Sequence, residues 1–219
     1  MISRPDLREE LLRRAQLDQT ARRGATSGEQ ALQTAVAVDD DNARWLKRVV
    51  RRVGWPVRSM VGEDGAHAAW LLAQHADRCP RLQRRCLTLL QQAGADGEAS
   101  GADVAHLTDR VCLANGKPQV YGTQLVARDG RFVPLRLRDP ETVDQRRAAV
   151  GLEPLQASSK PALERFGQPK PVPVPCRNCG AEISAWAPEP ASRIRVQCSF
   201  CGWTATLRLF TSTPASPAR

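Results

Sequence analysis

The 219-residue sequence lacks several features that would assign it to a common class of protein. No apolar run approaches the roughly 20 residues that cross a bilayer, so we expect no contact with a membrane. The first ten residues mix charges and lack the apolar core of a secretory signal, which favours a cytoplasmic protein. A glycine-rich phosphate loop and the strained turn that exposes a nucleophilic serine are also missing.

Lysine is scarce: only four of the 32 basic residues are lysine, and the others are arginine. The formal net charge of +9 would suit a nucleic-acid-binding protein, but the charge is dispersed. Residues 59–155, for example, contain 12 basic and 12 acidic side chains. Since no segment is a dense basic patch, charge alone leaves nucleic-acid binding open.

The clearest motif is a pair of C-x-x-C sequences near the C-terminus, separated by eighteen residues. Their four cysteines are Cys176, Cys179, Cys198 and Cys201. This spacing predicts one tetrahedral Zn²⁺ site, and four protein ligands leave no coordination position for a substrate. We therefore expect a structural zinc ion. The other three cysteines form no disulfide-like framework, which agrees with a reducing cytosol.

Hydrophobic periodicity predicts a series of helices before this motif. The first begins near Leu7, and Asp39-Asp40-Asp41-Asn42 is expected to cap the second. Further helices are predicted over 63–77, 80–93, 101–114 and 141–150. Residues 119–127 and 131–138 flank Asp129-Gly130, a signal for a two-residue hairpin that pairs Val126 with Val133.

These elements predict an α+β protein with two parts. Residues 1–155 form a mostly helical N-terminal domain with one β-hairpin, and residues 176–210 form a small all-β zinc ribbon. A proline-rich linker, 156–175, joins them, and its end, Lys170–Pro175, is expected to be a polyproline II spacer. A disordered tail, 211–219, completes the chain.

A group of polar residues in the helical domain is a candidate site. Its members are His75, Asp77, Asp109, Arg110, Tyr121, Gln124 and Arg147. His75 could act as a general base oriented by Asp77 or Asp109, and the two arginines could hold an anionic group. Tyr121 and Gln124 could position a carbonyl or an amide. The alternative is a buried polar network that fixes the hairpin against the helices.

The same region resembles an uncharacterised family of bacterial domains. The resemblance covers about residues 7–155 and rests on a series of short motifs: Asp18-Gln19, Asp41-Asn42, Gly54-Trp55-Pro56, Val61-Gly62, Trp70 to Asp77, Asp109-Arg110, Gln119 to Gln124, Val143 to Arg147 and Gly151-Leu152. It implies a mostly helical fold and no particular activity. The zinc ribbon departs from the single-domain layout of the family.

Three functions remain open at this point. The first is a zinc-binding accessory or recognition protein whose ribbon contacts a macromolecule, with a polar pocket of unknown ligand in the helical domain. The second is an enzyme that uses a His/Asp acid–base pair and an arginine anion clamp. The third is a nucleic-acid-binding protein that uses the ribbon and basic faces. The partner of the ribbon is accordingly a protein or a nucleic acid.

Overall fold

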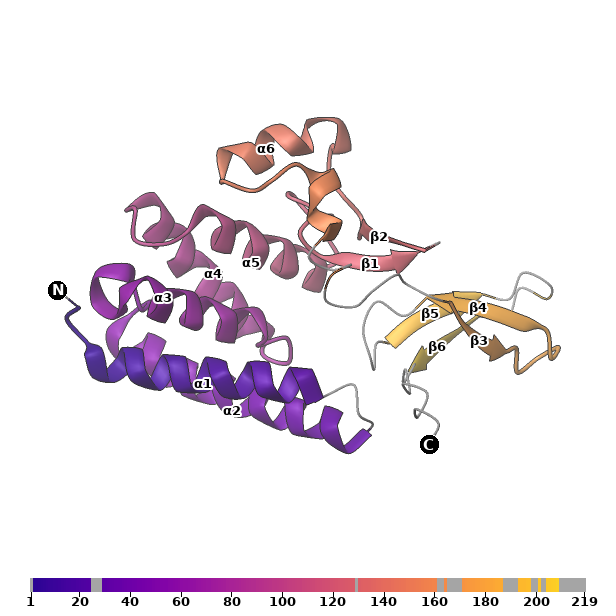
Figure 1. Cartoon of the computed structure of the whole chain (residues 1–219), viewed down its shortest axis with the longest axis horizontal. Coiled ribbons are helices and arrows are strands. Elements are labelled where there is room, and N and C mark those ends of the chain that lie inside the picture. Colours follow the sequence, from indigo (N-terminus) through magenta and orange to yellow (C-terminus); the bar gives the residue numbers. More distant parts are fainter. Residues whose placement is uncertain are drawn as a thin grey trace, which may run out of the picture.

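A computed structural model describes residues 2–24, 29–128, 130–160, 164, 171–186, 193–197, 201 and 204–208. The N-terminal part is mostly helical and contains a small β-hairpin, as the sequence predicts (Figure 1). Among the described residues, the helices are too short or too polar to cross a membrane.

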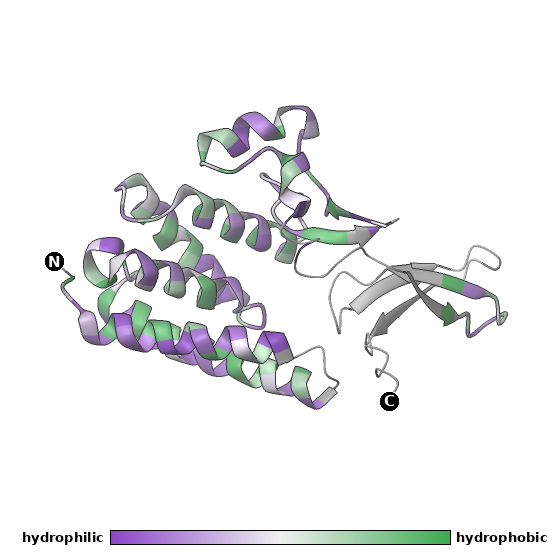
Figure 2. Cartoon of the chain, in the orientation of Figure 1, coloured by the Kyte–Doolittle hydropathy of each residue, from purple (hydrophilic) through white to green (hydrophobic). Residues whose placement is uncertain are grey.

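Five longer helices build this part: α1 (Pro5–Gly24), α2 (Glu29–Val53), α3 (Arg58–Gln74), α4 (Pro80–Ala95) and α5 (Gly101–Ala114). Helix α1 packs against both α2 and α3, and α4 packs against α5 (Figure 1). The core between the helices consists mainly of leucine, valine and alanine side chains, with Trp55 and Cys86. Apolar residues alternate with polar ones along α1 and α2 (Figure 2). Leu11, Leu46 and Leu72 are among its fully buried members.

Helix α2 begins about ten residues earlier than the sequence predicts, at Glu29. The three consecutive aspartates therefore lie inside the helix and do not cap it. Each pairs with an arginine from another segment: Asp39 with Arg22 at 2.8 Å, Asp40 with Arg78 at 3.2 Å and Asp41 with Arg14 at 2.8 Å. These tertiary ion pairs offset the poor helix propensity of aspartate.

Helix α3 is interrupted at Gly62, where φ is 78°. Residues with a side chain rarely adopt this conformation, so glycine is needed at the bend. A Cβ atom there would also lie 3.0 Å from Cδ1 of Ile2 and 3.1 Å from Oδ1 of Asp64. The predicted start of the helix, residue 63, corresponds to the segment that follows this bend.

The hairpin consists of β1 (Leu125–Arg128) and β2 (Arg131–Pro134), and its register pairs Val126 with Val133 as predicted. Asp129 of the predicted turn lies outside the described residues. The regular ladder is shorter than predicted because residues 120, 121 and 123 donate their N–H groups to Asp109. The one-turn helix η2 (Pro140–Thr142), helix α6 (Val143–Ala149) and the short helix η3 (Leu155–Ser159) follow.

Four strands are described in the C-terminal part: β3 (Pro171–Pro175), β4 (Glu182–Trp186), β5 (Arg193–Gln197) and β6 (Thr204–Arg208). They form two antiparallel pairs, β3 with β4 and β5 with β6. The predicted polyproline spacer thus corresponds to strand β3. Proline is compatible with an edge strand, because only every second residue there bonds to the partner. The predicted tail, 211–219, lies outside the described residues.

Candidate functional site

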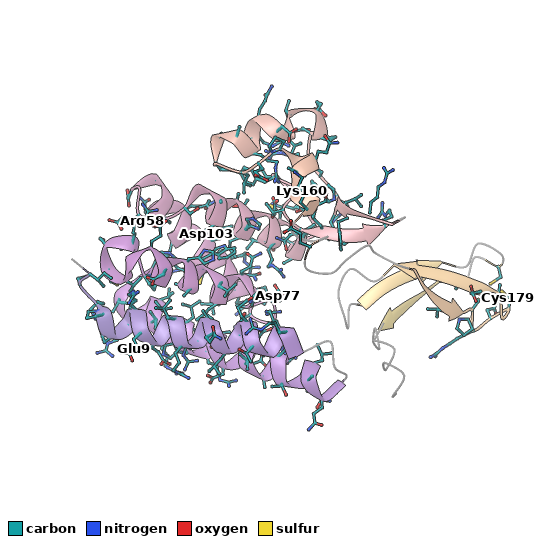
Figure 3. The ribbon with its side chains drawn as sticks, in the orientation of Figure 1. Glu9, Arg58, Asp77, Asp103, Lys160 and Cys179 are labelled. Atoms are coloured by element: carbon teal, nitrogen blue, oxygen red, sulfur yellow. The ribbon has the colours of Figure 1, made fainter. Side chains whose placement is uncertain are left out.

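The first C-x-x-C motif forms a tight turn between β3 and β4. Cys176 donates its N–H to the carbonyl of Ala181 at 2.8 Å, and Gly180 donates to the carbonyl of Cys176 at 2.9 Å. Gly180 has φ of 76°, a conformation that glycine adopts without strain. The turn thereby places the buried Cys176 beside Cys179. Cys179 lies at the surface (labelled in Figure 3).

Three cysteine sulfurs lie together at this turn. Those of Cys176, Cys179 and Cys201 lie within 4.8 Å of one another, so they could bind a metal ion. The sulfurs of Cys176 and Cys201 are 3.7 Å apart, much longer than a disulfide bond of about 2.05 Å. A tetrahedral site with Zn–S bonds of about 2.3 Å requires neighbouring sulfurs roughly 3.8 Å apart. The spacing therefore fits a tetrahedral thiolate site. Cys198, the fourth predicted ligand, lies outside the described residues.

In the helical part, Asp109 anchors the loop that precedes the hairpin. It is completely buried on α5. Its carboxylate accepts hydrogen bonds from the N–H groups of Val120, Tyr121 and Thr123 at 2.7, 3.0 and 2.8 Å, and from the hydroxyl of Thr123 at 3.0 Å. A carboxylate with this many donors is a satisfied structural group.

Three further side chains hold the same loop. Gln119 is fully buried, and its amide bonds to the backbone of Gln124 at both ends, at 3.0 and 2.7 Å. Arg147 donates to the carbonyls of Tyr121 and Glu153 at 2.7 and 2.6 Å, and Arg146 donates to that of Val120 at 2.8 Å. Burial lowers the pKa of Arg147. We call Asp109, Gln119, Arg146 and Arg147 the loop-anchoring cluster.

The loop-anchoring cluster accounts for four of the seven predicted site residues. Asp109 and Arg147 belong to it, and Tyr121 and Gln124 contribute the backbone groups that it binds. The arrangement corresponds to the buried polar network that the sequence left open as an alternative. Gly122, inside the loop, has φ of 69°, and a Cβ there would lie 2.9 Å from Leu155. The loop is therefore closely packed.

His75 belongs to a different group of charged residues, at the C-terminal end of α3. Its Nδ1 atom lies 2.8 Å from Oδ1 of Asp18, a residue of α1 whose side chain is completely buried. Gln19 donates to the other oxygen of Asp18 at 2.9 Å. A buried carboxylate at Nδ1 fixes the ring orientation and directs Nε2 away from α1.

Arg22 joins His75 to a second carboxylate. Its Nε lies 3.0 Å from Nδ1 of His75 and 3.4 Å from Asp18, and its NH2 donates to both oxygens of Asp39 at 2.8 and 3.0 Å. Nδ1 cannot donate to Asp18 and accept from Arg22 at the same time, so the site has two proton arrangements. We call Asp18, Arg22, Asp39 and His75 the His75 cluster.

The protonation of the His75 cluster is strongly perturbed. Burial, together with the nearby Asp18 carboxylate, raises the pKa of Asp39 to about 7, although the charge of Arg22 opposes this. Burial also lowers the pKa of His75, against the effect of its hydrogen bond to Asp18. For Asp18, burial favours the neutral form, but the hydrogen bond and charge of His75 with the charge of Arg22 prevail and lower its pKa. The neutral form of the His75 ring is therefore favoured, and Asp39 keeps its proton to a much higher pH than an ordinary carboxyl group.

Asp77 and Arg110, the remaining predicted residues, lie next to this cluster. Asp77, in the turn after α3, accepts from NH1 of Arg110 at 2.8 Å and from the buried amide of Gln83 at 3.1 Å (Figure 3). Arg110 is close enough to His75 for its charge to lower the pKa of the ring. His75, Asp77 and Arg110 are thus brought together, whereas Asp18 occupies the position predicted for Asp77 or Asp109 as the partner of His75.

Sequence reasoning missed three members of the His75 cluster as site residues: Asp18, Arg22 and Asp39. In the sequence, Asp18 stands only within a family motif, and the pattern around Asp39 predicts a helix cap. The distance along the chain explains this, because 57 residues separate Asp18 from His75. The sequence did contain one signal for this cluster: three adjacent aspartates in a segment with helical periodicity. Carboxylates inside a helix need positively charged partners from other segments.

The comparison with protein families agrees with the resemblance noted above. The model of DUF6624, a family of unknown function, matches residues 5–167, which is most of the chain. The chain belongs to the DUF6624 family. The DUF6624 region contains both polar clusters and extends beyond the predicted domain boundary at residue 155. No curated protein and no solved structure matches the chain significantly.

Proposed function

We propose that the chain is a zinc-binding accessory or recognition protein that couples its DUF6624 domain to a zinc ribbon. Cys176, Cys179, Cys198 and Cys201 would hold one Zn²⁺ ion. The observation that supports this proposal is the 3.7 Å separation of the Cys176 and Cys201 sulfurs, which fits one edge of a tetrahedral thiolate site. The ion would be structural, since four thiolates complete its coordination.

The metal would supply the stability that such a small ribbon cannot obtain from a core. Strands β3 to β6 contain five residues each and form only two-stranded pairs among the described residues. Isolated two-stranded sheets are marginally stable in water. Structural zinc contributes on the order of 10 kcal/mol to the folding of comparable sites.

The composition of β5 and β6 favours an anionic partner for the ribbon. Arg193 pairs with Arg208, and Arg195 pairs with Thr206. Together the two strands contain three arginines and no acidic residue. The partner would be an acidic protein surface or, as a second candidate, a nucleic acid.

Metal analysis of the purified, reduced full-length protein tests the zinc assignment. We expect one zinc per chain, and none in Cys176→Ser. Cys112→Ser is the matched control, since Cys112 lies on α5 outside the motif, and it should retain one zinc. A wild-type protein without stoichiometric metal, or a Cys176→Ser variant that retains it, would contradict the proposal.

A salt titration distinguishes the two candidate partners. Binding to random single- and double-stranded DNA and RNA should weaken steeply with salt if phosphates are the target. The triple variant R193Q/R195Q/R208Q should abolish that binding while one zinc per chain is retained. If wild-type protein binds no nucleic acid at low salt, the nucleic-acid candidate is excluded, and the acidic protein surface remains.

A further inference from the structure

The His75 cluster differs from the rest of the polar interior because its side chains reach the surface. The exposed fractions are 14% for His75, 26% for Arg22 and 20% for Asp39, and Arg110 beside them is 29% exposed. Asp18 beneath them is fully buried. The cluster therefore combines a fixed, buried carboxylate with an outer layer that a small molecule can contact.

Several hydrogen-bonding atoms of this outer layer are not satisfied within the protein. Nε of Arg110 is buried and has no hydrogen-bond partner among the described residues. Within the same part of the chain, both close contacts of His75 are made by Nδ1, and those of Arg22 by Nε and NH2. Nε2 of His75 and one terminal nitrogen of Arg22 therefore remain available to a ligand.

We infer that Arg22, Arg110 and His75 form a binding site for a small molecule that carries an oxyanion group such as phosphate, and that His75 exchanges a proton with it. Guanidinium groups pair with phosphate through charge-assisted hydrogen bonds. Burial lowers the pKa of His75 and so favours the neutral ring, which has a lone pair that can accept a proton. This site lies in the DUF6624 domain and is independent of the proposed zinc site.

The proton transfer requires no other reactant. Nε2 of His75 would accept the proton of a hydroxyl group or water molecule next to the bound oxyanion. The carboxylate of Asp18 would stabilise the resulting imidazolium through Nδ1, 2.8 Å away. The same proton would then return to that oxygen atom, so that His75 and its partner end in their initial states and no other bond changes. Asp18 is thus a positioning residue, and His75 is the group that contacts the substrate.

Asp39 makes anion binding depend on pH. It occupies NH2 of Arg22 through two hydrogen bonds, so an ionised Asp39 competes with an incoming anion for the same guanidinium. The charged and titratable groups that face Asp39 are Arg22 and Asp18 from α1 and His75 from the end of α3, and the polar atoms of Asp18, Asp39 and His75 lie within 4.8 Å of one another. When Asp39 gains a proton, the competition is removed. Anion binding should therefore be accompanied by proton uptake, and its affinity should fall as the pH rises above about 7.

Sulfate is a suitable probe, because its charge is constant over this pH range. We expect calorimetric titration of the zinc-loaded, full-length protein to show one sulfate per chain. Its affinity should fall by up to about tenfold per pH unit between pH 7 and 8.5. Arg22→Gln and Arg110→Gln should each weaken binding roughly tenfold or more. Asp39→Asn should bind at pH 8.5 about as tightly as the wild type binds at pH 7.

The control is Arg51→Gln, which removes an exposed arginine from α2 and should bind sulfate like the wild type. Circular dichroism of each variant identifies any that fail to fold, and Arg110→Lys, which keeps the charge, provides a second test at that position. Failure of the wild type to bind sulfate would overturn the inference. So would equal affinity in Arg22→Gln and Arg110→Gln, or an unchanged pH dependence in Asp39→Asn. Because Cys176→Ser should leave sulfate binding intact, these failures are distinguishable from failure of the zinc proposal.

Discussion

The loop-anchoring cluster and the His75 cluster contain similar residue types but use them differently. In the former, Asp109 and Arg147 bind backbone groups of one loop. In the latter, Asp18, Arg22 and Asp39 bind other side chains, and all but Asp18 reach solvent. Residue type alone therefore does not identify a functional site. The two clusters are distinguished by the partners of their polar side chains, which are backbone groups in the first and other side chains in the second.

The difference predicts opposite responses to mutation. Removing a side chain that satisfies backbone N–H groups leaves buried donors without acceptors, which costs stability. Removing a carboxylate that lies close to another carboxylate can relieve the repulsion between their charges. The loop-anchoring cluster should therefore be sensitive in folding assays, and the His75 cluster in ligand binding and pH dependence.

The largest effect is expected for Asp109→Ala. Three backbone N–H groups and a hydroxyl would lose their acceptor in a buried environment, which should lower the free energy of unfolding by about 3–5 kcal/mol. Urea unfolding measures it. Asp96→Asn, at the exposed end of α4, is the control and should change stability by less than about 0.5 kcal/mol. A loss below about 1 kcal/mol for Asp109→Ala would remove the distinction between the clusters.

A smaller loss is expected for Gln119→Ala. Its buried amide holds the backbone of Gln124 and Leu135, so its removal leaves the N–H of Gln124 and the carbonyl of Leu135 without this partner. The carbonyl of Gln124 loses one donor but keeps the N–H of Leu135 at 3.1 Å. Carbonyl groups tolerate this better than N–H groups. Unfolding experiments should give a loss of about 2 kcal/mol. A loss as large as that of Asp109→Ala would show that the amide, rather than the carboxylate, is the main anchor.

Asp39→Asn should act in the opposite direction at high pH. The folded-state pKa of Asp39, about 7, is above the usual value of 3.8, so the folded protein retains a proton that the unfolded chain loses. Stability from this group is therefore lost as the pH rises from about 4 to 7. Asp39→Asn removes that dependence and should be more stable than the wild type at pH 8, by about 1–2 kcal/mol after solvent screening.

The comparison of Asp39→Asn with the wild type isolates the contribution of Asp39. His75 contributes to the pH dependence of stability in the opposite direction, but equally in both proteins. Burial lowers the pKa of His75, so its contribution to stability is lost as the pH falls through 6.5, in both proteins. The difference between Asp39→Asn and the wild type should grow from pH 4 to 7 and then stay constant. A difference that does not change with pH would mean that Asp39 titrates normally.

The smallest effect is expected for Arg51→Gln on the exposed face of α2. No ion pair of Arg51 is described, so stability should change by less than about 0.5 kcal/mol in thermal unfolding. A larger change would show that the outer charges of α2 contribute to the fold, and that the two clusters are not the main sites of polar stabilisation.

Much of the helical fold follows from local sequence signals. The bounds of α5 and the pairing of Val126 with Val133 were predicted correctly, because periodicity and turn residues act over a few positions. The start of α2 was predicted wrongly, because the aspartates at 39–41 are tolerated inside a helix only through arginines from other segments. Such compensation cannot be read from the helix itself.

The candidate site shows the same limit. Sequence reasoning selected His75 and Arg110 from their polar context but grouped them with Asp109 and Arg147, which anchor the loop instead. The true neighbours of His75 come from α1 and α2, and no local pattern links residues 18, 39 and 75. Only tertiary packing determines which polar side chains share a site.

The alternating prolines of β3 have a consequence for the solubility of the C-terminal part. Val172 and Val174 hold the register positions opposite Ala185 and Ile183, and they alone can donate N–H groups to β4 over this stretch. The prolines between them leave the outer edge of the strand with carbonyl oxygens but no donors. A strand of another chain could form only half of the usual ladder hydrogen bonds at this edge, which disfavours edge-to-edge aggregation.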